Sequence, residues 1–113
     1  MELFRPVGKK EYALIELNGF TKFPPRLPEQ PIFYPVLNEK YAVEIASKWN
    51  TKNGNTGYVL RFIVSDEYIK RFDIQTVGRV YHQEFWIPSE KLDEFNENII
   101  GKIEVIHKFE GTV

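Results

Sequence analysis

The sequence contains no cysteine and only two histidines, His82 and His107. The absence of cysteine excludes disulfide bridges, thiolate nucleophiles and cysteine-ligated zinc or iron–sulfur sites. Two histidines also exclude a metal site built from three imidazoles. We therefore expect a protein that works without a metal ion.

The chain also lacks an excess of basic residues and a long apolar run. Fifteen Lys and Arg against sixteen Asp and Glu give a net charge of −1, which argues against sequence-independent nucleic-acid binding, although a local basic patch stays compatible. No apolar run approaches the roughly 20 residues that span a bilayer. The first residues form neither a basic leader nor an apolar stretch. We expect a soluble, cytoplasmic protein with no membrane partner.

What the sequence does contain is enough apolar material for one core. Its 113 residues are 42% hydrophobic and show no internal repeat or linker, which predicts a single small domain over residues 1–113. Aromatic residues make up 15% of the chain, and packing explains most of them. Helical and strand-like segments are mixed along the chain, so the predicted fold class is α+β.

Two segments carry the clearest periodicity. Alternation over 58–64 predicts a central strand that is apolar on both faces. Apolar residues at helical spacing predict a helix over 39–49, which begins at Asn38 and packs through Ala42, Ile45, Ala46 and Trp49. The remaining expected elements are strands at 3–7, 32–37, 74–77, 80–87 and 103–109, a helix at 9–17, and short helices capped by Ser65 and Ser89.

A stiff loop follows the first helix. Residues 23–31 hold four prolines within nine residues, which prevents regular backbone hydrogen bonding. Such a loop is either a rigid connector or one wall of a ligand site. Arg26 lies inside it and could reach a phosphate or nothing at all.

The segment 81–86 is the most informative for chemistry. On a strand, His82, Glu84 and Trp86 share one face, while Phe85 and Ile87 share the other, which is the better core face. An imidazole and a carboxylate beside a large ring on a rigid element are typical of a small catalytic or binding site. The alternative is that His82 and Glu84 are solvated on an outward face.

Three further residues have two interpretations each. Arg5 sits in an otherwise apolar strand, where it either extends to solvent or binds an anion. Tyr34 and Tyr41 flank a strand-to-helix turn and form either an aromatic wall for a flat ligand or part of the core. Residues 54–57 lack the lysine and the spacing of a phosphate-binding glycine loop.

The order of these features resembles the ADP-ribosyltransferase superfamily. The motifs are Arg5-Pro6-Val7-Gly8 on the first strand, Phe33-Tyr34-Pro35 leading into a helix, and Glu84 on a late strand. Nearly the whole chain also resembles a family of short proteins labelled "ADP-ribosylation/crystallin". The motifs that carry this resemblance lie at 23–28, 33–38 and 82–88. The resemblance implies a split β-sheet with short helices, NAD as substrate, and Arg5, Tyr34 and Glu84 lining one cleft.

The implied chemistry is transfer of ADP-ribose from NAD to an unknown protein or nucleic-acid acceptor, or hydrolysis of NAD. Glu84 would stabilise the cationic sugar that forms when the nicotinamide bond breaks, and His82 would orient or deprotonate the acceptor. Arg5 and Arg26 would hold the pyrophosphate, and Tyr34 and Tyr41 would stack on nicotinamide.

This arrangement requires Arg5 and Glu84 to project from the same face of the sheet, with the proline loop at the rim of the cleft. One alternative is a non-catalytic protein-interaction domain that binds through the proline loop and exposed aromatic residues. Another is a binder of single-stranded nucleic acid, which the acidic balance disfavours.

Overall fold

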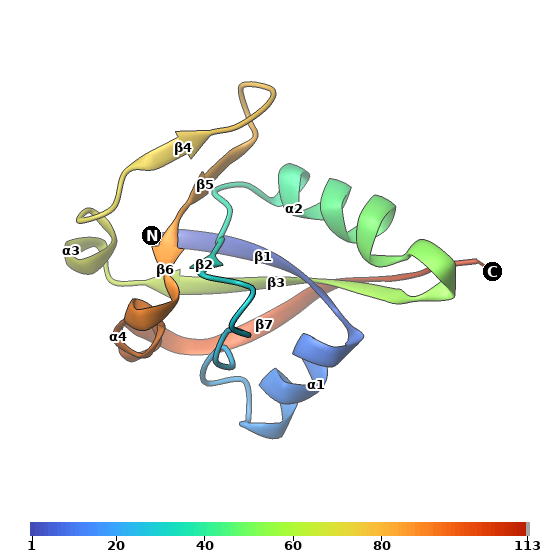
Figure 1. The fold of residues 1–113 in the computed structure, drawn as a ribbon, viewed down its shortest axis with the longest axis horizontal. Coiled ribbons are helices and arrows are strands. Elements are labelled where there is room, and N and C mark those ends of the chain that lie inside the picture. The colour runs from blue at the N-terminus through green and yellow to red at the C-terminus, as the bar shows by residue number, and fades with distance from the viewer. Residues whose placement is uncertain (113) are drawn as a thin grey trace.

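A three-stranded antiparallel sheet forms the centre of the protein (Figure 1), whose computed structural model describes residues 1–112. Its strands are β1 (Glu2–Gly8), β3 (Thr56–Val64) and β7 (Ile99–Glu110), in the order β1-β3-β7. The predicted central strand is confirmed: β3 pairs on both sides, and Phe62 is only 1% exposed.

Val36 continues the sheet beyond β1. Its backbone exchanges two hydrogen bonds with Phe4 of β1, at 2.9 and 2.8 Å, and it also forms an antiparallel bridge with Glu84. Glu84 belongs to β5 (Gln83–Phe85), which pairs with β4 (Ile74–Thr76). A separate pair, β2 (Ile32–Phe33) and β6 (Ile87–Pro88), lies beside this junction.

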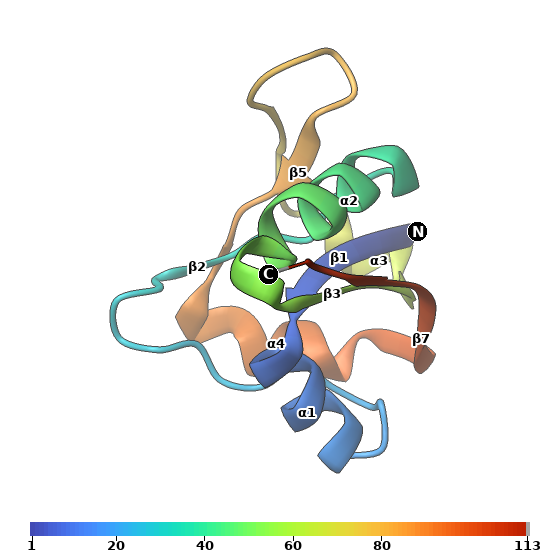
Figure 2. The same cartoon turned by 90° about the vertical axis from the view of Figure 1, so that its right-hand side faces the viewer.

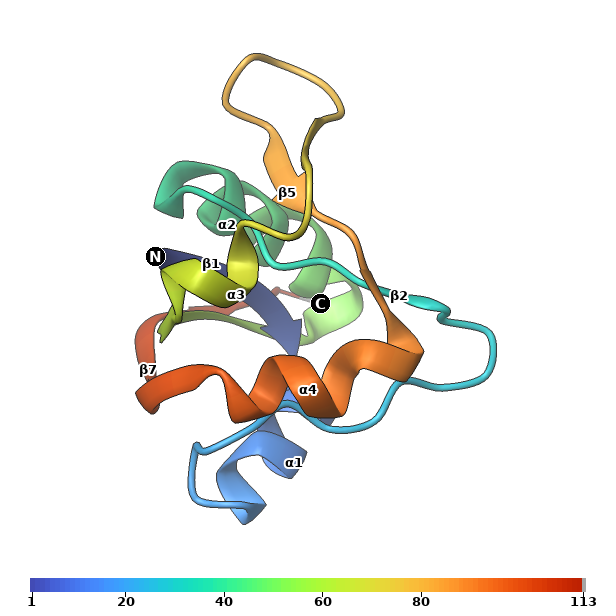
Figure 3. The same cartoon turned by 90° about the vertical axis from the view of Figure 1, so that its left-hand side faces the viewer.

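Helices cover the two faces of the sheet unequally. Helix α2 (Glu39–Ile45) lies on one face, and α1 (Lys9–Leu17) and α4 (Leu92–Glu97) lie on the other (Figure 2). The short α3 (Asp66–Ile69) follows β3 at the end of the sheet near the N-terminus (Figure 3). Each face has its own hydrophobic cluster, and the cluster under α1 and α4 is the larger. The mixture of elements in one unit confirms the α+β prediction.

The predicted helix over 39–49 is confirmed in its first part. The Asn38 side chain accepts a hydrogen bond from the Tyr41 backbone N–H at 2.8 Å, as expected of an N-terminal cap. From Ala46 to Asn50 the helix widens into a π-helical turn. Trp49 is 63% exposed there and packs against the Lys52 ammonium, so its predicted place in the core is wrong.

The predicted strand over 80–87 is wrong in its first part. The His82 N–H donates to the Arg79 carbonyl at 2.9 Å, so a tight turn replaces the strand, and Val80 is 84% exposed. Ser65 occupies the predicted N-cap position of α3, but its side chain makes no capping hydrogen bond. The prediction for Ser89 is wrong, because Pro88 and Lys91 precede the two helical turns after β6. The backbone carbonyls of both serines accept helical hydrogen bonds, so the turns form without their side chains.

Within residues 1–112, no helix has the length and apolar character needed to cross a membrane.

Candidate functional site

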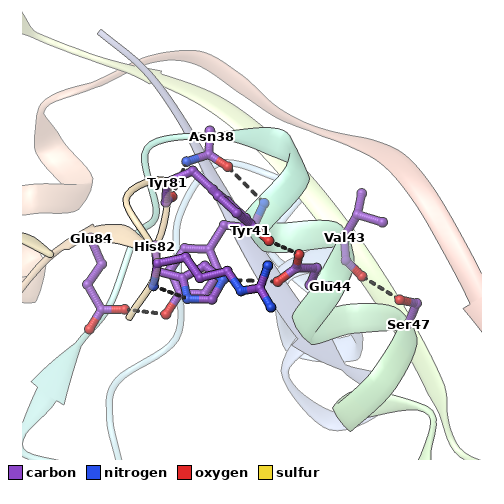
Figure 4. Close-up of polar contacts among 9 residues, drawn as sticks. Asn38, Tyr41, Val43, Glu44, Ser47, Tyr81, His82 and Glu84 are labelled. Carbon is purple, nitrogen blue, oxygen red and sulfur yellow. Dashed lines mark hydrogen bonds and ion pairs between the residues drawn. The ribbon is translucent and has the colours of Figure 1, made fainter. Parts of the chain in front are cut away.

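Glu84 is a buried carboxylate held by two donors. It is 9% exposed, and its Oε2 accepts a hydrogen bond from the Tyr41 hydroxyl at 3.0 Å (Figure 4). Its Oε1 accepts one from the Trp86 indole N–H at 2.8 Å. A carboxylate bonded at both oxygens keeps one orientation, and this fixes the direction of its negative charge.

The carboxylate borders an open hollow of about 430 Å³. The residues that line it come from β1, the segment 34–36, α2, β5 and the residue after β5: Arg5, Pro6, Tyr34, Val36, Ile45, Glu84 and Trp86. Tyr34 and Trp86 are 40% and 44% exposed, so each presents ring surface to solvent. The volume falls in the range of small-molecule sites, and exposed rings around one carboxylate suit a flat polar ligand.

The predicted convergence of Arg5, Tyr34 and Glu84 on one hollow is therefore observed, but Arg5 differs from the expectation. Phe4, Val36 and Glu84 lie side by side across the sheet, so their side chains share one face. Alternation along β1 directs the Arg5 side chain to the opposite face. The requirement that Arg5 and Glu84 project from the same face is not met, and Arg5 lines the hollow as part of the strand.

The Arg5 guanidinium is already neutralised by α1. Its Nε and Nη2 donate to the two oxygens of Glu11 at 2.6 and 2.8 Å, and Nη1 donates to the Tyr34 carbonyl at 3.3 Å. The group also packs over the Phe33 ring, 4.5 Å from its centroid. An arginine bound in this way holds β1, α1 and the Tyr34 segment together. It could bind the phosphates of NAD only after it leaves Glu11.

His82 lies behind Tyr41 rather than in the hollow. The Arg79 backbone N–H donates to its Nδ1 at 3.1 Å, so in the neutral ring Nε2 carries the hydrogen and donates to Glu44 at 3.0 Å. The imidazole stacks on the Tyr41 ring with centroids 4.5 Å apart. With both nitrogens engaged, His82 positions Tyr41, which in turn holds Glu84. Its predicted role toward an acceptor stays a prediction.

The sequence interpretation missed the group that ties the β4–β5 hairpin to α2. Glu44 accepts hydrogen bonds from the Tyr81 hydroxyl and from His82, and Asn38 donates to the Tyr81 carbonyl. The Tyr81 bond, followed by the His82 contacts, lowers the pKa of Glu44, and the same bond raises the pKa of Tyr81. Helical spacing could have identified Glu44, because it follows Tyr41 by three residues and shares its side of the helix.

The Tyr41 hydroxyl stays protonated and acts as a hydrogen-bond donor at neutral pH. Burial, together with the hydrogen bond to Glu84, raises the pKa of Tyr41 to about 12. The hydroxyl therefore keeps its proton at neutral pH and donates it toward Glu84. The predicted stacking of Tyr41 on a ligand does not match this position, since Tyr41 supports the carboxylate and stacks on His82.

Arg26 and the proline loop do not line this hollow. They line a different one, between the loop and α1. The expectation that the proline loop forms the rim of the Glu84 cleft is therefore wrong, because the chain after β5 supplies that rim through Trp86. A role for Arg26 in holding the pyrophosphate has no support from its position.

Residues 1–112 bring together no group of three or more His, Cys, Asp or Glu side chains able to hold a metal ion. Comparison of the chain with protein-family descriptions, curated proteins and solved structures found no match.

Proposed function

We propose that the Glu84 hollow binds the nicotinamide-ribose half of NAD and promotes cleavage of the bond that joins nicotinamide to the ribose. The observation that carries the proposal is the fixed carboxylate of Glu84 between two exposed rings, Tyr34 and Trp86. The resemblance to ADP-ribosyltransferases supports it through Tyr34 and Glu84, which line this hollow. The third motif residue, Arg5, does not add support, because its side chain projects from the opposite face of the sheet and pairs with Glu11. We propose the junction at Val36 as the counterpart of the split in the sheet of that fold.

The reaction needs negative charge near the sugar. When the bond between ribose C1′ and the nicotinamide nitrogen breaks, its electron pair leaves with nicotinamide and positive charge develops on the ribose. A fixed carboxylate stabilises this charge more strongly in the transition state than in the ground state. Glu84 would also accept a hydrogen bond from a ribose hydroxyl. Attack of water on C1′ then gives ADP-ribose and one proton.

The acceptor decides between hydrolysis and transfer. Water gives NAD glycohydrolase activity, whereas a nucleophile on an unknown protein or nucleic acid gives ADP-ribosyl transfer. The hollow is open to solvent beside Tyr34 and Trp86, which leaves room for either acceptor. The paired state of Arg5 limits the proposal to the nicotinamide-ribose half, because the pyrophosphate gains no free cation from this side chain.

A thermal-unfolding experiment with millimolar NAD tests the binding step. A ligand at 100 times its dissociation constant stabilises the native state by about 2.7 kcal/mol. Tyr34→Leu removes one ring and should weaken NAD binding about fivefold, the scale of an aromatic contact worth ~1 kcal/mol. Trp49→Leu is the control, because Trp49 is exposed but does not line the hollow. Equal NAD stabilisation in wild type and Tyr34→Leu would contradict the site.

The second candidate is a non-catalytic interaction domain. This function is favoured because Glu84 and Arg5 already form hydrogen bonds with other residues of the chain. Exposed apolar side chains at Leu27, Tyr34 and Trp86 would then contact a protein partner. Absence of stabilisation by NAD in the wild-type protein would favour this function over the enzymatic one.

A further inference from the structure

A second hollow, of about 310 Å³, lies between α1 and the proline loop. Its lining comes from these two segments alone: Lys10, Glu11, Leu14, Pro24, Pro25, Arg26, Leu27 and Gln30. It shares no lining residue with the Glu84 hollow. The two hollows are therefore separate sites, although Glu11 of the second contacts Arg5 of the first.

Arg26 is an almost buried cation without a hydrogen bond. Its side chain is 11% exposed, and no acceptor within residues 1–112 bonds its guanidinium. The Nε is fully buried and unpartnered. The nearest carboxylate oxygen, Oε1 of Glu11, is 3.7 Å from Nη1 and already accepts a hydrogen bond from Arg5. A buried charged donor without an acceptor is costly, and native proteins rarely keep one.

The local charge shows what is missing. Arg5 and Arg26 both face the single carboxylate of Glu11, so the cluster keeps one uncompensated positive charge. Burial, and then the neighbouring Arg5, lower the pKa of Arg26. One additional anion would neutralise the cluster. Lys10 also lines the hollow, but it is solvent-exposed and its charge is screened.

Apart from Gln30, the remaining walls are apolar. Leu14 and Leu27 are 51% and 56% exposed, and Pro24 and Pro25 lie beside them. Four prolines stiffen the loop, so these walls keep their shape without a ligand. The hollow therefore offers one planar cationic group next to a preformed apolar surface.

We infer that this hollow binds a small monocarboxylate with an apolar body. The carboxylate would accept hydrogen bonds from the Arg26 guanidinium, whose planar donor geometry matches two carboxylate oxygens. The apolar body would cover Leu14 and Leu27. A single negative charge neutralises the cluster of Arg5, Arg26 and Glu11, whereas a phosphate dianion would leave an excess of negative charge. Phosphate also has no apolar part to contact the leucines.

An NMR titration of the full chain with hexanoate tests the inference. The Arg26 Nε–H signal and the backbone amides of Leu14 and Leu27 should shift together and saturate. Arg26→Gln should weaken hexanoate binding by about tenfold to a hundredfold, as expected when hydrogen bonds to a charged group are lost. Arg26→Lys keeps the positive charge but not the planar pair of N–H donors, so its affinity for hexanoate should lie between those of the wild type and Arg26→Gln. Lys22→Gln removes an exposed charge outside the hollow and should bind like the wild type.

Several outcomes would overturn the inference. One is wild-type protein that shows no saturable shifts with hexanoate. Another is a folded Arg26→Gln variant, judged by its amide spectrum, that binds hexanoate as tightly as the wild type. Equal binding of 1-hexanol would mean that the charge is irrelevant, and tighter binding of inorganic phosphate would contradict the monocarboxylate class.

Discussion

At the scale of single residues, the site depends on hydroxyl and indole donors that surround one acid. The side chains of Tyr41 and Trp86 each donate their single hydrogen bond to Glu84, and the ring of His82 stacks on that of Tyr41. Removing a partner from a buried charged group is more costly than the mean value of a hydrogen bond suggests. The orientation of Glu84 is therefore set by its neighbours rather than by its own backbone alone.

The first prediction concerns the ionisation of Tyr41. In protein labelled with ¹³C at the tyrosine rings, the Tyr41 signal, assigned from Tyr41→Phe, should titrate near the raised pKa of about 12. Glu84→Gln should move the Tyr41 pKa down toward the ordinary tyrosine value, because it removes a negative charge beside the hydroxyl. The raised pKa stabilises the fold below the ordinary tyrosine range, and this contribution is lost as the pH rises through about 12. A Tyr41 pKa that is unchanged by Glu84→Gln would contradict the contact.

Single residues also show what the sequence could predict. Alternation correctly placed Glu84 and Trp86 on one face and Phe85 on the other. Alternation along β1 puts Arg5 on the face of Leu3 and Val7, but the partner of Arg5 could not be deduced from the sequence. Glu11 approaches Arg5 only because α1 folds back along β1, and this packing is a tertiary event.

At the scale of elements, β3 and the π-helical turn after α2 approach each other closely at Gly57. A Cβ added to Gly57 would lie 2.3 Å from the Ala46 carbonyl oxygen and 2.9 Å from the Asn50 Cβ. Both Gly57 and Ala46 are buried, so neither backbone can move away freely. The absence of a side chain at Gly57 is what lets the helix rest on the sheet behind the Glu84 hollow.

The second prediction is that Gly57→Ala destabilises the protein. Overpacking against fixed backbone should reduce the free energy of unfolding by about 1–3 kcal/mol. Gly8→Ala is the matched control, because the added Cβ would meet only the Asn50 amide at an ordinary 3.9 Å. Chemical denaturation of both variants measures the difference. Equal stability of the two variants would show that the close approach does not exist in solution.

The elements were predicted best where periodicity is long. The helix that begins at Asn38 and the strand through Phe62 follow directly from spacing. The segment 80–82 was predicted as strand because Val80 and Tyr81 have high strand propensity. In the structure the turn at Arg79 extends to His82, where His82 and Tyr81 bond to Glu44 on α2, a residue distant in the sequence.

At the scale of the whole molecule, the sheet separates two hydrophobic clusters of unequal size. The larger cluster contains Phe62, whose ring lies 4.8 Å from that of Phe23 and 6.1 Å from that of Phe95. The smaller cluster packs α2 onto the sheet through Ala42 and Ala46. The smaller face also carries the carboxylate of Glu84. Because the larger cluster buries more apolar side chains, we expect it to contribute more to the stability that holds the site.

The third prediction tests that division. Phe62→Ala should reduce the free energy of unfolding by about 3–5 kcal/mol, a large part of the ~5–15 kcal/mol typical of small domains. Ile100→Ala, at a position 59% exposed, should change it by less than about 0.5 kcal/mol. Urea denaturation measures both. A loss below about 1 kcal/mol for Phe62→Ala would contradict the role of the larger cluster.

The central claim is that Glu84 is a catalytic carboxylate for NAD, and nicotinamide release from NAD tests it most directly. Wild-type protein should release nicotinamide, and Glu84→Gln should bind NAD within a fewfold while releasing nicotinamide roughly 10²-fold more slowly. Glu104→Gln, an exposed charge change on β7, should retain the wild-type rate. Wild-type protein that releases no nicotinamide, or a Glu84→Gln variant that releases it at the wild-type rate, would contradict the claim.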